Sequence, residues 1–161
     1  MTITTQTNTR NRAGIILFSQ DKKHVLMVKP RLYEGEDPLK AKWGFPKGSA
    51  EENERMNECA SREFFEETGL YITIPKENVP NLYKGRCEQR VYYYLYTMSN
   101  TTKSHYDKIR SVYEGNYASR EISQIEFIPI DDLASMEQTL NSDARRIIRD
   151  INKYTEKAVV I

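Results

Sequence analysis

Acidic side chains gather at helical spacing in one part of this 161-residue chain. Glu63 and Glu67 are four residues apart and Glu63 and Glu66 are three apart, so a helix places all three on one face. Like charges at these spacings destabilise a helix by roughly 0.2–0.5 kcal/mol per pair. A bound cation offsets that repulsion, and clustered carboxylate oxygens suit Mg²⁺ or Mn²⁺. The spacing therefore predicts a divalent-metal site.

These acids lie in a segment, residues 51–69, whose composition predicts a helix. It holds strong helix formers and no proline, its first glycine is Gly69, and Gly48 lies just before it. Apolar residues recur within it at helical spacing and predict a face that packs on a sheet: Met56, Cys59, Ala60 and Phe64. Glu54 and Arg62 are eight residues apart, about two helical turns, so their side chains can meet and orient the acids without doing chemistry.

Residues 48–70 together resemble the signature box of the Nudix hydrolases. The residue types of the box occur here at every required offset, in the order Gly48, Glu54, Arg62, Glu63, Phe64, Glu66, Glu67, Gly69 and Leu70. The resemblance implies the α+β Nudix fold, in which a mixed β-sheet is sandwiched between helices (α/β/α). It also implies hydrolysis of a nucleoside diphosphate that is linked to another group.

The chemistry implied by this resemblance is the attack of water on one phosphorus of a pyrophosphate bridge. Divalent ions, Mg²⁺ or Mn²⁺, offset the charge of the phosphates and lower the pKa of bound water. Glu63, Glu66 and Glu67 are the expected ligands, with the carbonyl of Gly48 as a further oxygen. Glu66 or Glu67 can also act as the base, and the sequence does not separate these roles.

A second pair of acids, Glu121 and Glu126, lies outside the box in the predicted strand Glu121–Ile130. In many Nudix enzymes the general base lies outside the box, so both residues are candidates for it. Several segments together resemble the catalytic subunit of the eukaryotic mRNA-decapping enzyme: Trp43–Gly48, Cys59–Glu63, Glu66–Gly69 and Glu121–Phe127. In that family this strand carries an acid that approaches the metal, and the following helix is basic and contacts RNA. The alternative for both acids is an ordinary solvent-facing strand position.

Basic residues occur in two places that a phosphate-rich substrate would reach. The first is the loop Pro30–Lys42 and its flanks, with Lys29, Arg31, Lys40, Lys42 and Lys47. The second is a predicted amphipathic helix over Asp143–Lys157, whose basic residues are Arg145, Arg146, Arg149, Lys153 and Lys157. Its predicted buried stripe is Ala144, Ile147, Ile148, Ile151 and Tyr154. The alternative for the second group is a solvated helix face.

Composition indicates a soluble globular protein, with 39% hydrophobic and 29% charged residues. The net charge is +1, so binding of nucleic acid requires a local basic patch. Two cysteines, Cys59 and Cys87, are too few for a disulfide framework or a zinc site, which favours the reducing cytoplasm. No stretch approaches the roughly 20 apolar residues of a membrane span.

The chain is expected to form a single domain over residues 12–161, preceded by a flexible leader at residues 1–11. The predicted strands are Arg12–Phe18, His24–Lys29, Tyr71–Ile74, Leu82–Met98 and Glu121–Ile130. Within the fourth, the run Tyr92–Tyr94 is expected to bury one face and expose the other. A short helix is expected around His105–Tyr113.

Three functions are compatible with these residues. The first is decapping, in which capped RNA is cleaved and m7GDP is released. In the decapping family a regulatory domain precedes the Nudix domain and helps to hold the cap, whereas this chain begins almost at the Nudix domain. Compact decapping enzymes without that arrangement occur among large DNA viruses, and this Asn-, Lys- and Tyr-rich chain fits that kind. The second is hydrolysis of dinucleoside polyphosphates, diphosphoinositol polyphosphates or nucleoside triphosphates. The third is a non-catalytic RNA- or nucleotide-binding module, and the intact acids argue against it.

Overall fold

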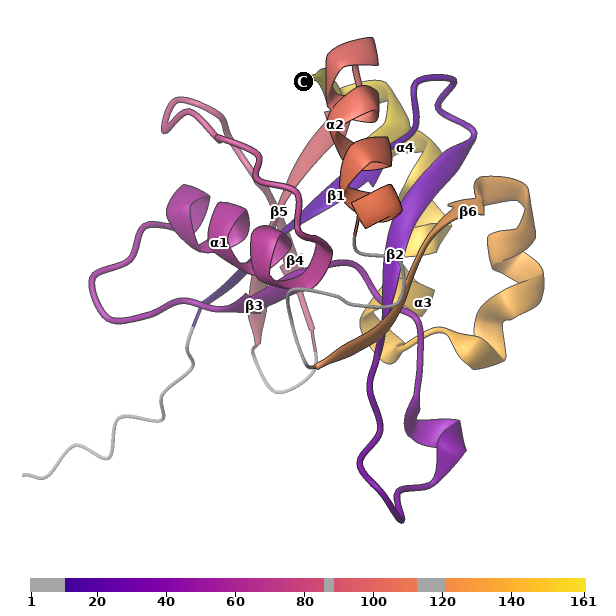
Figure 1. The fold of residues 1–161 in the computed structure, drawn as a ribbon. Coiled ribbons are helices and arrows are strands. Elements are labelled where there is room, and N and C mark those ends of the chain that lie inside the picture. The colour runs from indigo at the N-terminus through magenta and orange to yellow at the C-terminus, as the bar shows by residue number, and fades with distance from the viewer. Residues whose placement is uncertain (1–10, 86–88, 113–120) are drawn as a thin grey trace, which may run out of the picture.

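The computed structural model describes residues 11–85, 89–112 and 121–161, and its centre is a seven-stranded sheet (Figure 1). The predicted leader, residues 1–11, lies outside the described residues except for Asn11. In this described part of the chain, no helix is long and apolar enough to cross a membrane. The strands are β1 (Arg12–Phe18), β2 (His24–Pro30), β3 (Lys47–Ser49), β4 (Asn81–Lys84), β5 (Arg90–Thr97), β6 (Ile122–Pro129) and β7 (Val159–Val160). The helices are α1 (Met56–Thr68), α2 (Asn100–Val112), α3 (Ser142–Ile147) and α4 (Ile151–Lys157), with short 3-10 segments η1 (Pro38–Lys40), η3 (Ile130–Thr139) and η4 (Ile148–Asp150).

The order of the strands places β1 at the centre of the sheet. It runs β4-β5-β1-β2-β6, and β7 pairs with the last residues of β5. β1 and β5 are parallel, whereas β4 and β6 pair antiparallel with their neighbours, so the sheet is mixed. Tyr93 and Tyr94 are both buried, in clusters on different faces of β5. The expectation that one face of this tyrosine run is exposed is wrong, because a central strand carries packed side chains on both faces.

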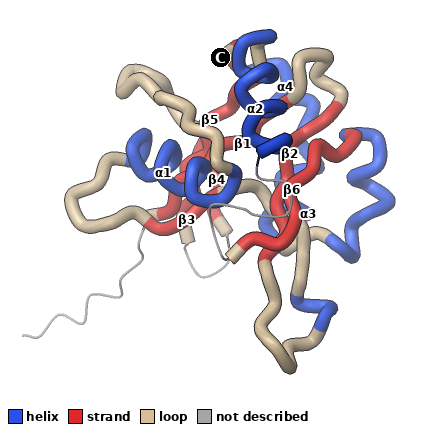
Figure 2. The backbone as a smooth tube through the Cα atoms, viewed as in Figure 1, coloured by secondary structure: helices blue, strands red, loops and turns tan. Residues whose placement is uncertain are grey.

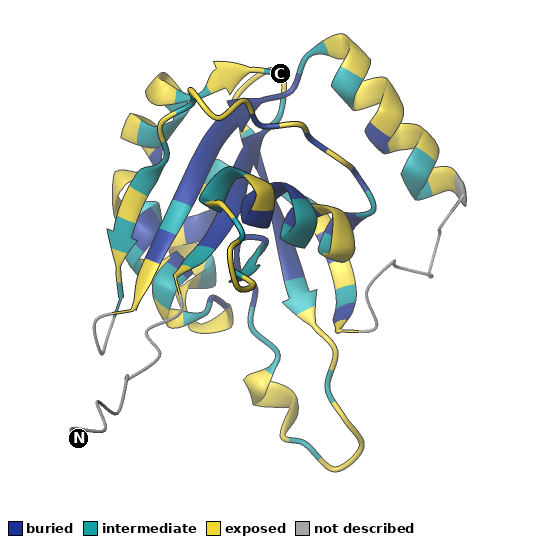
Figure 3. Cartoon of the chain, turned by 90° about the vertical axis from the view of Figure 1, so that its left-hand side faces the viewer, coloured by how far each residue is buried: buried dark blue, intermediate teal, exposed yellow. Residues whose placement is uncertain are grey.

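Two apolar clusters, one on each face of the sheet, hold the helices in place. The first joins Phe64 of α1 and Tyr106 of α2 to the sheet, and the second joins Leu133 of η3 and Ile147 of α3. Figure 1 shows α1 and the α3–α4 segment on different sides of the sheet, and Figure 3 shows the buried strands between them. The predicted α+β class with a sandwiched mixed sheet is therefore confirmed. The lone tryptophan, Trp43, is buried in the second cluster.

β1 changes its neighbour half-way along its length, and this change opens the sheet. Its first residues, Arg12–Gly14, pair with β3, whereas Phe18 pairs with β2. The segment Trp43–Gly48 crosses between these two strands. Within it, Gly44 exchanges two hydrogen bonds of 2.9 Å with the backbone of Val28 in β2. The crossing segment therefore brings the start of the box to the point where β2 and β3 separate.

α1 begins five residues later than predicted, at Met56. Residues 51–55 form a turn in which Asn53 has a φ of 64°, a left-handed conformation that interrupts a helix. Arg55 is extended and precedes the first helical residue. The helix ends where the sequence predicts, because Gly69 adopts a φ of 80° that favours glycine. The acids of the box therefore lie in the regular part of α1.

The predicted strand Tyr71–Ile74 is wrong, because this segment pairs with no strand in the part of the chain that the structure describes. Ile72 and Ile74 are buried in the first cluster, which explains the alternating pattern. Their carbonyls accept hydrogen bonds from side chains of α1, from the Ser61 hydroxyl at 2.6 Å and the Asn57 amide at 3.0 Å. The segment Tyr71–Ile74 therefore packs on α1 and is not a strand of the sheet.

The later helices also differ in extent from the predictions. α2 begins at Asn100, five residues before the predicted His105, and the predicted end at Tyr113 lies outside the described residues. The predicted helix Asp143–Lys157 is divided into α3, η4 and α4, because the backbone tightens over Ile148–Asp150. Its apolar stripe packs on the second cluster as predicted, with Ala144, Ile147, Ile148, Ile151 and Tyr154.

Candidate functional site

Arg62 on α1 is the centre of a network of carboxylates. Its guanidinium donates to both oxygens of Glu54, at 2.7 and 2.9 Å, in a bidentate pair. It also donates to Glu63 at 2.9 Å and to Glu66 at 3.2 Å, and to the carbonyl of Ser49 at 3.0 Å. The side chains of Arg62 and Glu54 are 25% and 11% exposed, so the pair is largely shielded from solvent. The predicted contact between Glu54 and Arg62 is therefore present.

Glu67 is a partly buried acid of this group. It accepts a hydrogen bond of 3.1 Å from the backbone N–H of Lys47, the first residue of β3. Burial, with repulsion from Glu63 and Glu121, raises the pKa of Glu67 to about 8. The pKa of Glu63 is also raised, chiefly by burial. The site therefore holds more negative charge than its own residues neutralise, and a cation is the natural complement.

Gly48 lies where the chain passes closest to the acids. A Cβ atom at this position would overlap the carboxylate of Glu63. The Gly48 carbonyl points toward α1, where it accepts a weak hydrogen bond of 3.5 Å from the Cys59 thiol. Cys59 itself is buried, as predicted. Because Gly48 has no side chain, the Glu63 carboxylate can lie against the backbone at this position.

Substituting Gly48 by Ala is expected to weaken binding of Mn²⁺ by about tenfold or more while changing the free energy of unfolding by less than about 1 kcal/mol. The added methyl displaces only the end of the flexible Glu63 side chain. Gly14→Ala is the matched control, because its methyl meets the backbone carbonyl of Pro46 and should cost roughly 1–3 kcal/mol of stability. Calorimetric Mn²⁺ titration and urea unfolding separate the two effects. Equal losses of stability in the two variants would contradict the prediction.

The structure separates the two acids that lie outside the box. Glu121 lies in the turn before β6, and its charge contributes to the raised pKa of both Glu63 and Glu67, so it is near the cluster. Glu126 is opposite Met27 in the β2–β6 register, and Met27 belongs to the second cluster, on the face away from α1. The structure therefore brings Glu121 to the box acids and places Glu126 on the other face of the sheet.

A pocket of about 250 Å³ adjoins the acids at the point where β2 and β3 separate. Its charged and polar lining consists of Lys40, Lys42, Lys47, Glu67 and Asn141. Its apolar and backbone lining consists of Val28, Pro30, Gly44, Phe45 and Ile122. Two of the lysines come from the loop between β2 and β3, which projects from the sheet (Figure 2). The pocket thus joins one partly buried carboxylate to three lysines, an arrangement suited to a polyphosphate beside a metal.

Two residues at the start of α3 belong to this site and were missed by sequence reasoning. Asn141 caps α3 by accepting from the Ala144 N–H at 2.8 Å, and its own N–H donates to the Trp43 carbonyl at 2.9 Å. Asp143 forms an ion pair with the ammonium of Lys47. An Asn followed by the predicted helix is a capping signal, but nothing local connects it to Lys47.

The remaining basic candidates fall into two groups. Lys29 lies over the ring of Trp43, at 5.5 Å from the centroid, and Arg31 is exposed, so neither lines the pocket. Lys153 is exposed and lies 3.8 Å from Asp150. The arginines of α3 and η4 gather around a hollow of about 230 Å³ that is lined by Glu137, Ser142, Arg145, Arg146 and Arg149. The structure therefore brings three of the five predicted basic residues of this helix together.

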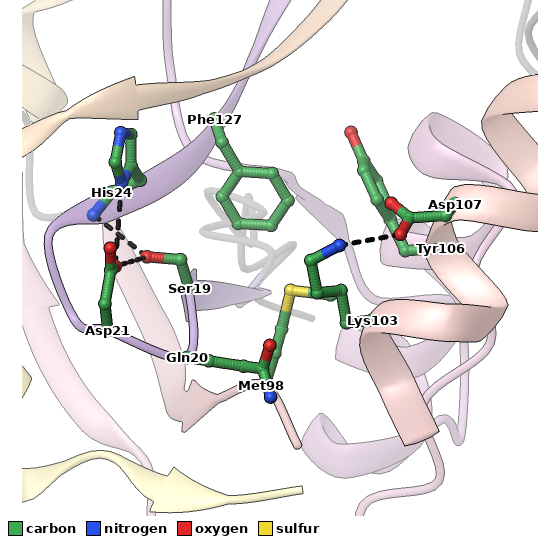
Figure 4. A pocket seen from close by; sticks show the side chains of 9 residues that line it. All are labelled: Ser19, Gln20, Asp21, His24, Met98, Lys103, Tyr106, Asp107 and Phe127. Carbon is green, nitrogen blue, oxygen red and sulfur yellow. Dashed lines mark hydrogen bonds and ion pairs between the residues drawn. The ribbon is translucent and has the colours of Figure 1, made fainter. Parts of the chain in front are cut away.

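A further pocket, of about 340 Å³, lies near the start of β2, away from the acids (Figure 4). Met98, Phe127 and Tyr106 form its apolar floor, and the two rings meet edge to face with centroids 5.1 Å apart. The β1–β2 turn and α2 form its walls, where Figure 4 shows Asp21 with His24 on one side and Lys103 with Asp107 on the other. This pocket contains none of the box residues.

The acids of the box supply carboxylate oxygens, the kind of ligand that a divalent metal such as Mg²⁺ binds. Across the described ranges, no three His, Cys, Asp or Glu side chains are arranged as a ready metal site. Arg62 donates hydrogen bonds to the carboxylates of both Glu63 and Glu66. The donors are hard oxygens, and Glu67 with its raised pKa is not paired with Arg62. This donor set suits Mg²⁺ or Mn²⁺ rather than a softer metal.

In the metal-free protein, the free energy of unfolding is expected to fall as the pH rises from about 4.5 to about 8. Over this range folded Glu67 keeps a proton that the unfolded chain has lost, so the unfolded state gains relative stability as the pH rises. The slope is at most about 1.4 kcal/mol per pH unit for one such group. Urea unfolding in a chelator at several pH values measures it. Glu67→Gln should flatten the curve, and an unchanged slope in that variant would contradict the assignment.

Comparison with known proteins identifies the arrangement. The family model of the NUDIX domain matches residues 8–151. The chain belongs to the NUDIX domain family. Family members are pyrophosphohydrolases that generally use divalent metal ions, and this Nudix chain is accordingly an enzyme of that type.

Relatives of this Nudix chain include the m7GpppN-mRNA hydrolase dcap-2 of Caenorhabditis elegans, which is 31% identical over 120 residues. The match covers 74% of this chain but only 14% of the length of that relative. Among solved structures, a NUDIX hydrolase from Nitrosomonas europaea has a TM-score of 0.60 at 15% identity, covering 89% of this chain and 88% of the other. An Ap4A hydrolase of C. elegans in a binary complex has a TM-score of 0.60 at 14% identity, covering 91% and 99%. Both structures share the fold.

Proposed function

We propose that this Nudix enzyme is a metal-dependent hydrolase that cleaves the 5′ cap of mRNA and releases m7GDP. One observation carries the proposal: two consecutive residues line, respectively, the pocket beside Glu67 and the hollow formed by Arg145, Arg146 and Arg149. Asn141 lines the pocket and the next residue, Ser142, lines the hollow. If the phosphates of a substrate lie in the pocket, the rest of the substrate can reach the basic surface formed by these arginines. A long anionic chain uses both places, whereas a small nucleotide needs only the first.

The proposed mechanism assigns a role to each group of side chains. Glu63, Glu66, Glu67 and the Gly48 carbonyl would hold Mg²⁺ or Mn²⁺, which would neutralise phosphate charge and lower the pKa of water. Glu121, near these acids, is the proposed general base and accepts the proton of the attacking water. The lysines that line the pocket bind the phosphate oxygens of the bridge: Lys40, Lys42 and Lys47. Arg62 binds no substrate and holds the acids of α1 in place.

The similarity to dcap-2 supports this substrate, because the name of that relative describes hydrolysis of capped mRNA. The match covers a small part of that protein, so it supports the chemistry of this domain. Whether a partner protein is needed to bind the cap is a question for experiment. We place the proposed activity in the cytoplasm.

A second candidate function is hydrolysis of small polyphosphates such as dinucleoside polyphosphates, diphosphoinositol polyphosphates or nucleoside triphosphates. The observation in its favour is that the pocket alone, with three lysines in about 250 Å³, offers contacts for several phosphates. A solved neighbour of the fold is an Ap4A hydrolase, which acts on a substrate of this kind. In this case the arginine hollow has no part in turnover.

A substrate panel with Mg²⁺ and with Mn²⁺ separates the two functions. It contains cap-labelled RNA, free cap dinucleotide, a diadenosine polyphosphate and a diphosphoinositol substrate. Decapping predicts release of m7GDP from capped RNA, with an efficiency that rises with RNA length. Cleavage of the small substrates with capped RNA untouched would overturn the proposal.

The triple variant Arg145→Gln/Arg146→Gln/Arg149→Gln tests the RNA path. For capped RNA its KM is expected to rise about tenfold or more at physiological salt, and the salt dependence to weaken by a slope of roughly 0.7 for each lost phosphate contact. Turnover of the cap dinucleotide should not change. Lys153→Gln is the matched control, because Lys153 is exposed and does not line the hollow. Equal effects of the triple variant on RNA and dinucleotide would contradict the path.

A further inference from the structure

We propose that Asp143 is a positioning residue that holds the ammonium of Lys47 away from Glu67 and so keeps Glu67 available for the divalent metal. This inference rests on the proposed function in one respect, the role of Glu67 as a metal ligand. It concerns a residue of α3, outside the box, that does not itself contact the metal or the substrate.

The ion pair between Lys47 and Asp143 is well placed for this task. The two side chains are only 17% and 20% exposed, so solvent competes little for either charge. Asp143 lies in the first turn of α3, whose cap Asn141 is held to the Trp43 carbonyl at 2.9 Å. Gly85, which follows β4, lies near the second oxygen of Asp143: a Cβ atom added to this glycine would be 3.4 Å from that oxygen. The carboxylate therefore has little freedom to leave Lys47.

Glu67 is the alternative partner for Lys47. The backbone N–H of Lys47 donates to the Glu67 carboxylate at 3.1 Å, and both residues line the same pocket. A lysine stem is long and flexible, so an ammonium released from Asp143 can turn to the neighbouring carboxylate. It would then occupy the oxygens that a divalent cation needs. Asp143 thus prevents competition between an internal cation and the bound one.

The same pairing leaves Lys47 useful to the substrate. An ammonium has three N–H donors, and Asp143 occupies one side of the group. Lys47 also lines the pocket with Lys40 and Lys42. Fixing the ammonium at one donor lowers the loss of side-chain entropy when phosphate binds.

The test is the binding of Mn²⁺ alone, measured by calorimetry on the full chain without substrate. Asp143→Ala is expected to weaken Mn²⁺ binding by about tenfold, the lower end of the effect of residues that orient metal ligands. Asp143→Ala/Lys47→Met should restore the affinity to within about threefold of the unsubstituted protein, because no ammonium is left to occupy Glu67. Asp143→Glu should bind like the unsubstituted protein. Asp150→Ala is the matched control, since it removes an exposed acid of η4, and its affinity should not change.

Two outcomes would overturn the inference. One is unchanged Mn²⁺ affinity in Asp143→Ala, and the other is a double variant that binds as weakly as Asp143→Ala. Asp143→Asn, which keeps the shape of the side chain, replaces Asp143→Ala if circular dichroism shows that the latter does not fold. Failure to cleave capped RNA, with this binding pattern intact, counts against the proposed substrate only. The reverse result counts against the role of Asp143 only.

Discussion

Replacing Glu67 by Gln is expected to lower kcat on a cleaved cap substrate by at least about a thousandfold, which corresponds to about 4 kcal/mol of transition-state stabilisation. The substitution keeps the size of the side chain and removes the charge that is proposed to bind the metal. The hydrogen bond from the Lys47 N–H at 3.1 Å can still be accepted by the amide oxygen of glutamine, so the fold should persist. Steady-state kinetics at saturating Mg²⁺ measures the loss, and circular dichroism checks the fold.

The matched control for this prediction is Glu58→Gln. Glu58 lies on the same helix, is exposed and is not part of the network around Arg62. Its substitution should leave kcat unchanged within about twofold. The assignment of Glu67 would be refuted if Glu67→Gln retained more than about a tenth of the activity. Equal losses in the two variants would point to a general effect of charge on α1 instead.

Replacing Arg62 by Ala is expected to lower the free energy of unfolding by about 3 kcal/mol. The reason is the state of Glu54, which is 11% exposed and loses a bidentate partner at 2.7 and 2.9 Å. The Ser49 carbonyl loses a donor as well. Glu63 and Glu66 lose the cation that draws them together, so metal binding should also change. Urea unfolding in a chelator measures the stability term without the metal.

Two further variants decide whether this cost comes from the unpaired acid. Arg62→Ala/Glu54→Gln should recover part of the lost stability, because the buried charge is removed along with its partner. Arg55→Ala is the control, since Arg55 is exposed and its nearest carboxylate atom, on Glu58, lies 4.0 Å away. It should change stability by less than about 0.5 kcal/mol. The explanation fails if the double variant is less stable than Arg62→Ala alone.

The sequence was sufficient for the box because the box is local. Glu63, Glu66 and Glu67 lie on one helix, where spacing along the chain determines spacing between side chains. Arg62 and Glu54 were expected to meet on the same grounds, and they do, although Glu54 lies in the turn before α1 rather than inside the helix. The same periodicity predicted the apolar face of α1 correctly. The family and the class of reaction thus follow from residues 48–70.

Periodicity was less reliable where the partner of a segment is not local. Tyr71–Ile74 alternates like a strand, but its buried residues face α1 and not a neighbouring strand. An alternating pattern shows only that one face is buried. It does not show which element packs on that face. The same limit applies to Tyr92–Tyr94, where the number of covered faces depends on the place of β5 in the sheet.

The tertiary structure separates Glu121 from Glu126, which the sequence could not do. The two residues are five apart, so a regular strand directs them to opposite faces, but the sequence does not say which face meets α1. The register of β6 with β2 answers this by placing Glu126 opposite Met27. A register shift between Lys29 and Pro30 accompanies the end of the pairing next to Glu121.

By itself, the sequence determined that the acids of α1 share one face, because helical spacing converts directly into neighbouring side chains. Only the tertiary structure showed that β2 and β3 separate to form the pocket, and that Asp143 pairs with Lys47 across 96 residues of chain. Contacts of this kind depend on how the strands are ordered and where α3 docks on them. No local pattern carries that information, since the same residue types at the same spacing would suit a solvated helix equally well.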